Sequence, residues 1–251
     1  MNKDTLSRIG DAALAFIVLA AALTMAWKGL AGEREIPVSA APSNDSGTIP
    51  DEAAVVVIDA GHGGPDGGAQ GVSGSVEAEL NLKVAELISD MLTKRGLYVI
   101  MTRSTADALG ESKSADMAER GRIMRLPEAD LTVSIHMNKF GDPTVEGPMV
   151  FYMKGNKASE EFADAVMESL CKSLSRPLRR TNPEDLFVLR TPDVPAILVE
   201  CGFLSNAEDE AKLMTEEYRR SIAEGVCDGI TAYLAAKENG AGTSPFPVDG
   251  H

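Results

Sequence analysis

Short apolar runs alternate along the chain with longer stretches in which apolar residues recur every three or four positions. The runs are rich in β-branched residues and predict strands at 55–60, 97–102, 131–136 and 196–201, with a weaker one at 149–152. The helical period predicts helices over 77–95, 115–126 and 158–174, and two closing helices follow the N-cap residues Asn206 and Thr215. This alternation predicts a single α/β domain, with a mainly parallel sheet covered by helices on both faces.

The N-terminal region has a different pattern. Residues 12–27 form the only long apolar stretch, and basic residues precede it, which is typical of an export signal. We therefore expect a signal peptide or a membrane anchor over residues 1–31, both alternatives remaining open, and export of the rest of the protein. The composition predicts a flexible linker over 32–52, the folded domain over 53–237 and a disordered tail over 238–251.

Net charge and cysteine spacing argue against two kinds of binding, to nucleic acid and to a metal held by cysteines. The net charge of −14 argues against nucleic acid as a partner, because phosphate binding needs clustered Lys and Arg residues. The three cysteines, Cys171, Cys201 and Cys227, lack the spacing of a metal site, and we expect buried thiols.

Polar residues capable of chemistry stand where the predicted strands end. Only three histidines occur in the chain, and two of them, His62 and His136, close two apolar runs. Glu200 lies near the end of a third. Because ligands of parallel α/β sheets bind beyond the carboxyl ends of the strands, we expect these three side chains on one edge.

The helix predicted after His62 offers a further ligand. At about 100° per residue, Glu77 lies within the apolar stripe of this helix, whereas Glu79 lies on the opposite, charged face. A buried carboxylate needs a partner, and no Lys or Arg shares the stripe. Glu77 therefore either coordinates a metal or caps the first turn of its helix, where acids are favoured.

His62, Glu77 and His136 together form a donor set of two nitrogens and one oxygen. Such a set suits one Zn²⁺ ion and leaves a fourth position open for water. Glu200 is then available as the general base of a metal-assisted hydrolysis. A fourth ligand and an orienting acid behind the metal ligands are alternative roles for Glu200.

Five segments in this order and spacing resemble the zinc-dependent N-acetylmuramoyl-L-alanine amidases of amidase family 3. The segments are "VVIDAGHGGPDGGAQG", "VEAELNLKVA", "YVIMTR", "SIHMN" and "ILVECGFLSN". The resemblance implies an α/β fold, zinc bound by His62, Glu77 and His136, and Glu200 as the catalytic acid. It also implies hydrolysis of the amide between the lactyl group of N-acetylmuramic acid and L-alanine in peptidoglycan.

Within this family the chain is most similar to the germination-specific amidases of the spore cortex. Two alternatives to an amidase are a zinc-dependent peptidoglycan deacetylase and an inactive, membrane-tethered protein that binds the wall. The sequence leaves open any accessory protein, the oligomeric state and the preferred stem peptide.

Three further residues are candidates for substrate contacts. Asn138 lies two positions after His136 and so on the same side of a continuing strand, although an ordinary turn asparagine is an alternative. Arg103 and Arg190 lie near strand ends, where they could meet carboxylates of the stem peptide. Cys201 should face away from Glu200, which argues against a nucleophilic role.

Overall fold

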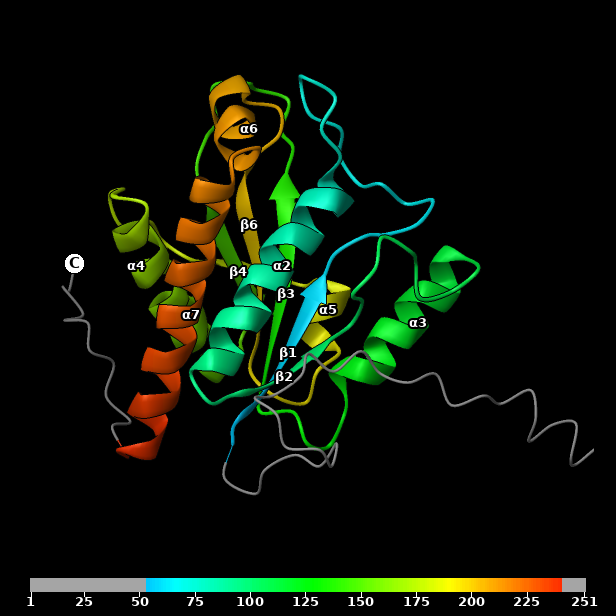
Figure 1. Cartoon of the computed structure of the whole chain (residues 1–251). Coiled ribbons are helices and arrows are strands. Elements are labelled where there is room, and N and C mark those ends of the chain that lie inside the picture. The colour runs from blue at the N-terminus through cyan, green and yellow to red at the C-terminus, as the bar shows by residue number, and fades with distance from the viewer. Residues whose placement is uncertain (1–52, 241–251) are drawn as a thin grey trace, which may run out of the picture. The chain divides into compact units, whose positions relative to one another are not determined.

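A six-stranded sheet forms the centre of residues 53–240, the part of the chain that the computed structural model describes (Figure 1). Its order is β2-β1-β3-β6-β4-β5. The strands are β1 (Val55–Ala60), β2 (Tyr98–Met101), β3 (Leu131–Asn138), β4 (Met149–Met153), β5 (Asn182–Glu184) and β6 (Ala196–Phe203). The helices are α2 (Glu77–Lys94), α3 (Lys113–Met124), α4 (Lys157–Ser173), α5 (Phe187–Arg190), α6 (Ala207–Leu213) and α7 (Glu216–Glu238).

Four strands run parallel and two run the other way. β1 pairs in parallel with β2 and β3, and β3 pairs in parallel with β6, so the predicted mainly parallel sheet is confirmed. β4 pairs antiparallel with β6, and β5 follows the direction of β4. The carboxyl ends of β1, β3 and β6 therefore share one edge of the sheet with the start of β4.

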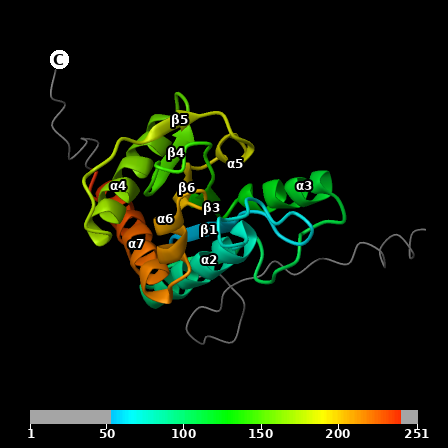
Figure 2. The same cartoon turned by 90° about the horizontal axis from the view of Figure 1, so that it is seen from above.

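Alternate side chains of the strands enter two separate cores, one on each face of the sheet. Val56 and Ile58 of β1 pack into the larger core, which α2, α4 and α7 cover. Val55 and Val57 point to the smaller core, which includes apolar residues of α3 and α5. Figure 2 shows the two groups of helices on opposite sides of the strands. Helices thus cover both faces, as the sequence pattern predicts, with most of the apolar burial beneath α2, α4 and α7.

The ends of the last two helices follow the predicted capping chemistry. The Asn206 side chain accepts hydrogen bonds from the backbone N–H groups of Glu208 and Asp209, and Thr215 accepts one from Tyr218. These side chains satisfy N–H groups that have no partner inside the helix. Both predicted N-caps are confirmed.

Several predicted segments lie wholly or partly outside residues 53–240. They are the signal peptide or anchor over 1–31, the linker over 32–52 and residues 241–251 of the predicted tail. Within 53–240, no helix combines the length and the apolar character needed to cross a membrane.

Candidate active site

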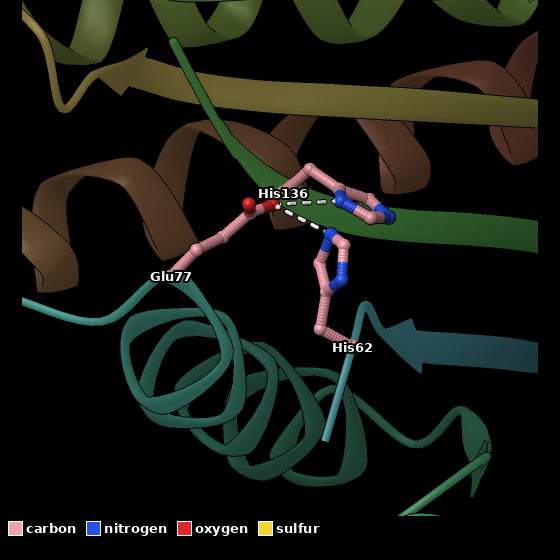
Figure 3. A group of neighbouring side chains, drawn as sticks. All are labelled: His62, Glu77 and His136. Atoms are coloured by element: carbon pink, nitrogen blue, oxygen red, sulfur yellow. Dashed lines mark hydrogen bonds and ion pairs between the residues drawn. The ribbon is translucent and has the colours of Figure 1, made fainter. Parts of the chain in front are cut away.

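Two adjacent strands and one helix bring His62, Glu77 and His136 together. His62 lies two residues beyond β1, His136 lies in the neighbouring strand β3, and Glu77 is the first residue of α2. Figure 3 shows the carboxylate of Glu77 directed at both imidazole rings. In α/β folds, ligands bind at the carboxyl ends of the parallel strands, which is where these three side chains lie.

The three side chains place their ligand atoms close to one another. Glu77 Oε1 lies 2.9 Å from His136 Nδ1 and 3.3 Å from His62 Nε2. One nitrogen of each ring and one carboxylate oxygen lie within 4.8 Å of one another, close enough to hold a metal ion. A pair of imidazoles with a carboxylate is a donor set suited to zinc, so the residues present fit that metal.

Glu77 is held in its ionised form. Its residue is 4% exposed, whereas Glu79 is exposed, so the helix presents the two glutamates as its apolar stripe predicts. Burial alone would raise the pKa of Glu77, but hydrogen bonds from His136, His62 and the Ala69 N–H lower it far below its usual range. A carboxylate that stays ionised is ready to bind a cation.

Asp66 fixes the His62 ring from the side away from Glu77. Asp66 Oδ1 lies 3.0 Å from His62 Nδ1, and Lys113 lies 3.3 Å from the other carboxylate oxygen of Asp66. A carboxylate on the second nitrogen of a ligating histidine sets its tautomer and its orientation. Asp66 is not among the residues predicted for the site. Its signal is an acid four residues after His62 within a glycine-rich run.

The glycines of this run leave room for the ligands. A Cβ on Gly61 would lie 2.2 Å from Cε1 of His136, and one on Gly68 would lie 2.5 Å from Oε2 of Glu77. Both positions thus need glycine because a ligand side chain packs against the backbone. His62 itself has a φ of 61°, a left-handed conformation that costs roughly 1–3 kcal/mol for a residue with a Cβ.

Glu200 lies beside His136 on the neighbouring strand. The two residues are register partners in the parallel pair β3–β6, so their side chains project from the same face of the sheet. Within residues 53–240, Oε2 of Glu200 is buried without a hydrogen-bond partner. Burial is the main reason that the pKa of Glu200 rises to about 7; Glu77 raises it further, while His136 and His62 lower it. Glu200 is thus a carboxyl group that can exchange a proton near neutral pH.

Cys201, the next residue after Glu200, is fully buried in the larger core, and burial raises the pKa of its thiol. The thiol is therefore unreactive and contributes only to the packing of the core. All three cysteines are free and buried, as predicted.

Asn138, a predicted substrate contact, ends β3 just after a bulge that follows His136. It is partly buried, and its Nδ2 lies 3.8 Å from Sδ of Met149, the β4 residue that pairs with Glu200. This position borders the site, and a substrate contact by Asn138 remains a prediction.

Arg103 requires a correction. It is 2% exposed, and its guanidinium donates hydrogen bonds to the backbone carbonyls of Ala60, Gly61 and Ala78 at 2.8–3.0 Å. A side chain committed to the backbone in this way has no free surface for a stem-peptide carboxylate. The predicted substrate contact by Arg103 is therefore wrong.

Arg190, the other predicted arginine contact, is the last residue of α5. It is exposed and paired with Asp185 at 2.8 Å. A substrate contact by Arg190 remains a prediction.

Fold and site together define an α/β protein with a candidate metal centre on the carboxyl edge of its sheet, an arrangement suited to hydrolysis. Comparison with known proteins makes the class specific. The sequence pattern of the N-acetylmuramoyl-L-alanine amidase family matches residues 56–232, and the chain belongs to this family of metal-dependent enzymes. Its reaction is the hydrolysis of an amide in peptidoglycan, so neither the deacetylase nor the inactive wall-binding alternative is supported.

Individual relatives agree with the family assignment. The germination-specific N-acetylmuramoyl-L-alanine amidase of Bacillus subtilis is 30% identical over 199 residues, which cover 76% of this chain and 84% of that protein. The CwlD amidase of Clostridioides difficile, solved in complex with the GerS lipoprotein, is 29% identical with a TM-score of 0.70. The alignment with CwlD covers 73% of this chain and 99% of that chain. The catalytic domain of CwlV from Bacillus (Paenibacillus) polymyxa is 34% identical with a TM-score of 0.66, covering 72% and 98% of the two chains.

Proposed function

We propose that this protein is a zinc enzyme that cleaves the amide between the lactyl group of N-acetylmuramic acid and the L-alanine of the stem peptide. His62, Glu77 and His136 bind the zinc ion, and Glu200 is the general base. The observation that supports this assignment is the convergence of two imidazoles and one ionised carboxylate within 4.8 Å, next to a second carboxyl group on the adjacent strand.

Each side chain has a separate task in the reaction. His62, Glu77 and His136 would hold the zinc ion, whose chemistry would be that of a Lewis acid for the amide carbonyl and for water. Glu200 accepts the proton of the attacking water and returns it to the alanine nitrogen as the C–N bond breaks. Burial raises the pKa of Glu200 in the metal-free protein, which suits a group that must first accept and then donate the proton.

The biological setting follows from the relatives and the substrate. Peptidoglycan lies outside the cytoplasmic membrane, and we propose that the protein is exported and acts there. We also propose a role in the spore cortex, which the similarity to the germination-specific amidase supports. Because CwlD was solved with a lipoprotein bound, a lipoprotein is the class of partner to test first for this chain.

Product analysis with purified muropeptides tests the proposed reaction. Incubation of the zinc-loaded protein should release the intact stem peptide with a new N-terminal alanine, identified by mass and by reaction of its amine. Release of acetate with an unchanged stem peptide would instead indicate a deacetylase. Absence of any product from protein with one bound zinc would contradict the proposed activity.

A further inference from the structure

The backbone just beyond β1 is bound by side chains. Ala60 ends the strand, and the carbonyls of Ala60, Gly61 and His62 all accept hydrogen bonds from arginine side chains. Buried carbonyl groups need donors, and here two guanidinium groups supply them. The last of these three residues is the candidate ligand His62.

Arg103, which follows β2, holds the first part of this segment. Its Nε donates to the Ala60 carbonyl at 2.9 Å, and one terminal nitrogen donates to the Gly61 carbonyl at 3.0 Å. The same nitrogen donates to the carbonyl of Ala78 in the first turn of α2, at 2.8 Å. Arg103 thereby joins the backbone before His62 to the helix that begins with Glu77.

Arg120, on α3, holds the second part. One of its terminal nitrogens donates to the Ala60 carbonyl at 2.8 Å and pairs with the buried Asp59 at 2.6 Å. The other donates to the carbonyl of His62 itself. Asp116 fixes the opposite side of the guanidinium, with 2.8 Å between its carboxylate and Nε. Arg120 is 2% exposed, so these contacts are shielded from water.

Burial of the two arginine charges costs desolvation free energy, which apolar side chains in the same place would avoid. Each is buried at 2% exposure, and burial together with the charge of Arg120 lowers the pKa of Arg103 to about 10. Replacement of a buried charge cluster by well-packed apolar residues often leaves the stability of a protein unchanged or increases it. Both arginines converge on one short segment, whose last residue is the left-handed His62.

We propose that Arg103 and Arg120 are positioning residues for the metal site. Their guanidinium groups hold the Ala60–His62 backbone in the conformation that directs the His62 imidazole at Glu77 and His136. The inference rests on the proposed function, because the orientation of His62 matters in this way only if it binds the metal. Its specific consequence is that the arginines set metal affinity and ligand geometry in addition to stability.

Metal binding by variants of Arg120 tests the proposal. Arg120→Lys keeps the charge beside Asp59, but a single ammonium group cannot bridge Asp59, Asp116 and two backbone carbonyls. Arg120→Gln removes the charge as well. The matched control is Arg176→Gln, which breaks a guanidinium pair with the buried Asp209 and touches no carbonyl of the His62 segment. Zinc affinity is measured by chelator competition, the visible spectrum of the Co²⁺-substituted protein reports ligand geometry, and urea unfolding of the metal-free protein reports stability.

We expect both Arg120 variants to lose about 10- to 100-fold in zinc affinity, the range usual for groups that orient metal ligands. Their Co²⁺ spectra should also differ from that of the wild-type protein. Arg176→Gln should lose stability while it keeps wild-type affinity and spectrum. Wild-type affinity and spectrum in Arg120→Lys, with stability lowered as in the control, would overturn the proposal.

A second position keeps the test decisive if the Arg120 variants do not fold. Arg103→Lys leaves the Arg120–Asp59 pair intact and removes the fork on the Ala60 and Gly61 carbonyls, so the same loss of zinc affinity is expected. Unchanged affinity in folded Arg103→Lys would then overturn the proposal. Wild-type protein that binds no zinc would contradict the proposed function itself, which separates the two failures.

Discussion

The start of α2 and the end of β6 each bring a carboxylate to the site, and the two are built in opposite ways. Glu77 accepts hydrogen bonds at both oxygens, from imidazole and backbone N–H groups, and these lower its pKa. Glu200 has one buried oxygen without a hydrogen-bond partner in the described part of the chain, and burial raises its pKa to about 7. The contrast separates a fixed, ionised ligand from a group free to carry a proton.

Removal of a ligand should have the largest effect. His136→Ala deletes one of the two nitrogens that converge on Glu77, and we expect it to abolish zinc binding and amide hydrolysis. Metal analysis of the purified variant together with the muropeptide assay checks this. Glu79→Gln is the control, because that side chain is exposed on α2, two residues after Glu77, and its replacement should change neither property. Stoichiometric zinc and full turnover in His136→Ala would contradict the ligand assignment.

Glu200→Gln should have the next largest effect. Glutamine keeps the size of the side chain but cannot take up a proton as a carboxylate does. The rate should fall by roughly 10²- to 10⁴-fold, the range usual for loss of a general base. Zinc content should stay at the wild-type level. A parallel loss of zinc would identify Glu200 as a ligand instead and would erase the contrast with Glu77.

The same substitution should stabilise the metal-free protein. Glu200 has a folded-state pKa of about 7 against an ordinary value of 4.5, so the unfolded chain ionises first as the pH rises. Ionised Glu200 therefore destabilises the fold progressively from pH 4.5 to 7, and fully above that. Glu200→Gln should gain at most about 3 kcal/mol above pH 7 and nothing below pH 4.5. Urea unfolding in chelator at several pH values measures this, and a gain that is independent of pH would refute the burial of the charge.

Asp66→Asn should have the smallest effect. The amide keeps a contact to His62 but no longer stabilises the ring by charge, so zinc affinity should fall by about 10- to 100-fold. Chelator competition measures the loss. An unchanged affinity would show that the backbone alone orients His62.

Local patterns along the chain predicted the parts of the fold and the site that depend on strand ends and helix faces. His62 and His136 were recognisable because each ends an apolar run, and Glu77 because it shares the stripe of its helix. The direction of β4 was not predictable, since an apolar run carries no information about its pairing partner. β5, with the sequence Asn-Pro-Glu, has no strand pattern at all.

Arg103 was misread for a different reason. In the sequence, a basic residue after a strand looks exposed. The fold, however, brings arginine side chains to three backbone carbonyls at the end of the neighbouring strand β1, and the sequence does not show that these carbonyls need donors. Asn81 and Arg120 were missed for the same reason. Asn81 stands one turn after Glu77 and donates to the Gly61 carbonyl at 3.1 Å, a contact that joins segments 20 residues apart.

The reversed strand β4 also places a surface loop at the border of the site. Because β3 ends and β4 begins on the same edge, residues 139–148 connect them without crossing the sheet, and this loop borders the site at both of its ends. Its Phe140 is 59% exposed, and Lys139 reaches the carbonyl of Gln70 across the rim. Surface loops accept insertions at little cost in free energy. Changes in the length and composition of this loop therefore alter the border of the site while the ligand-bearing strands stay as they are.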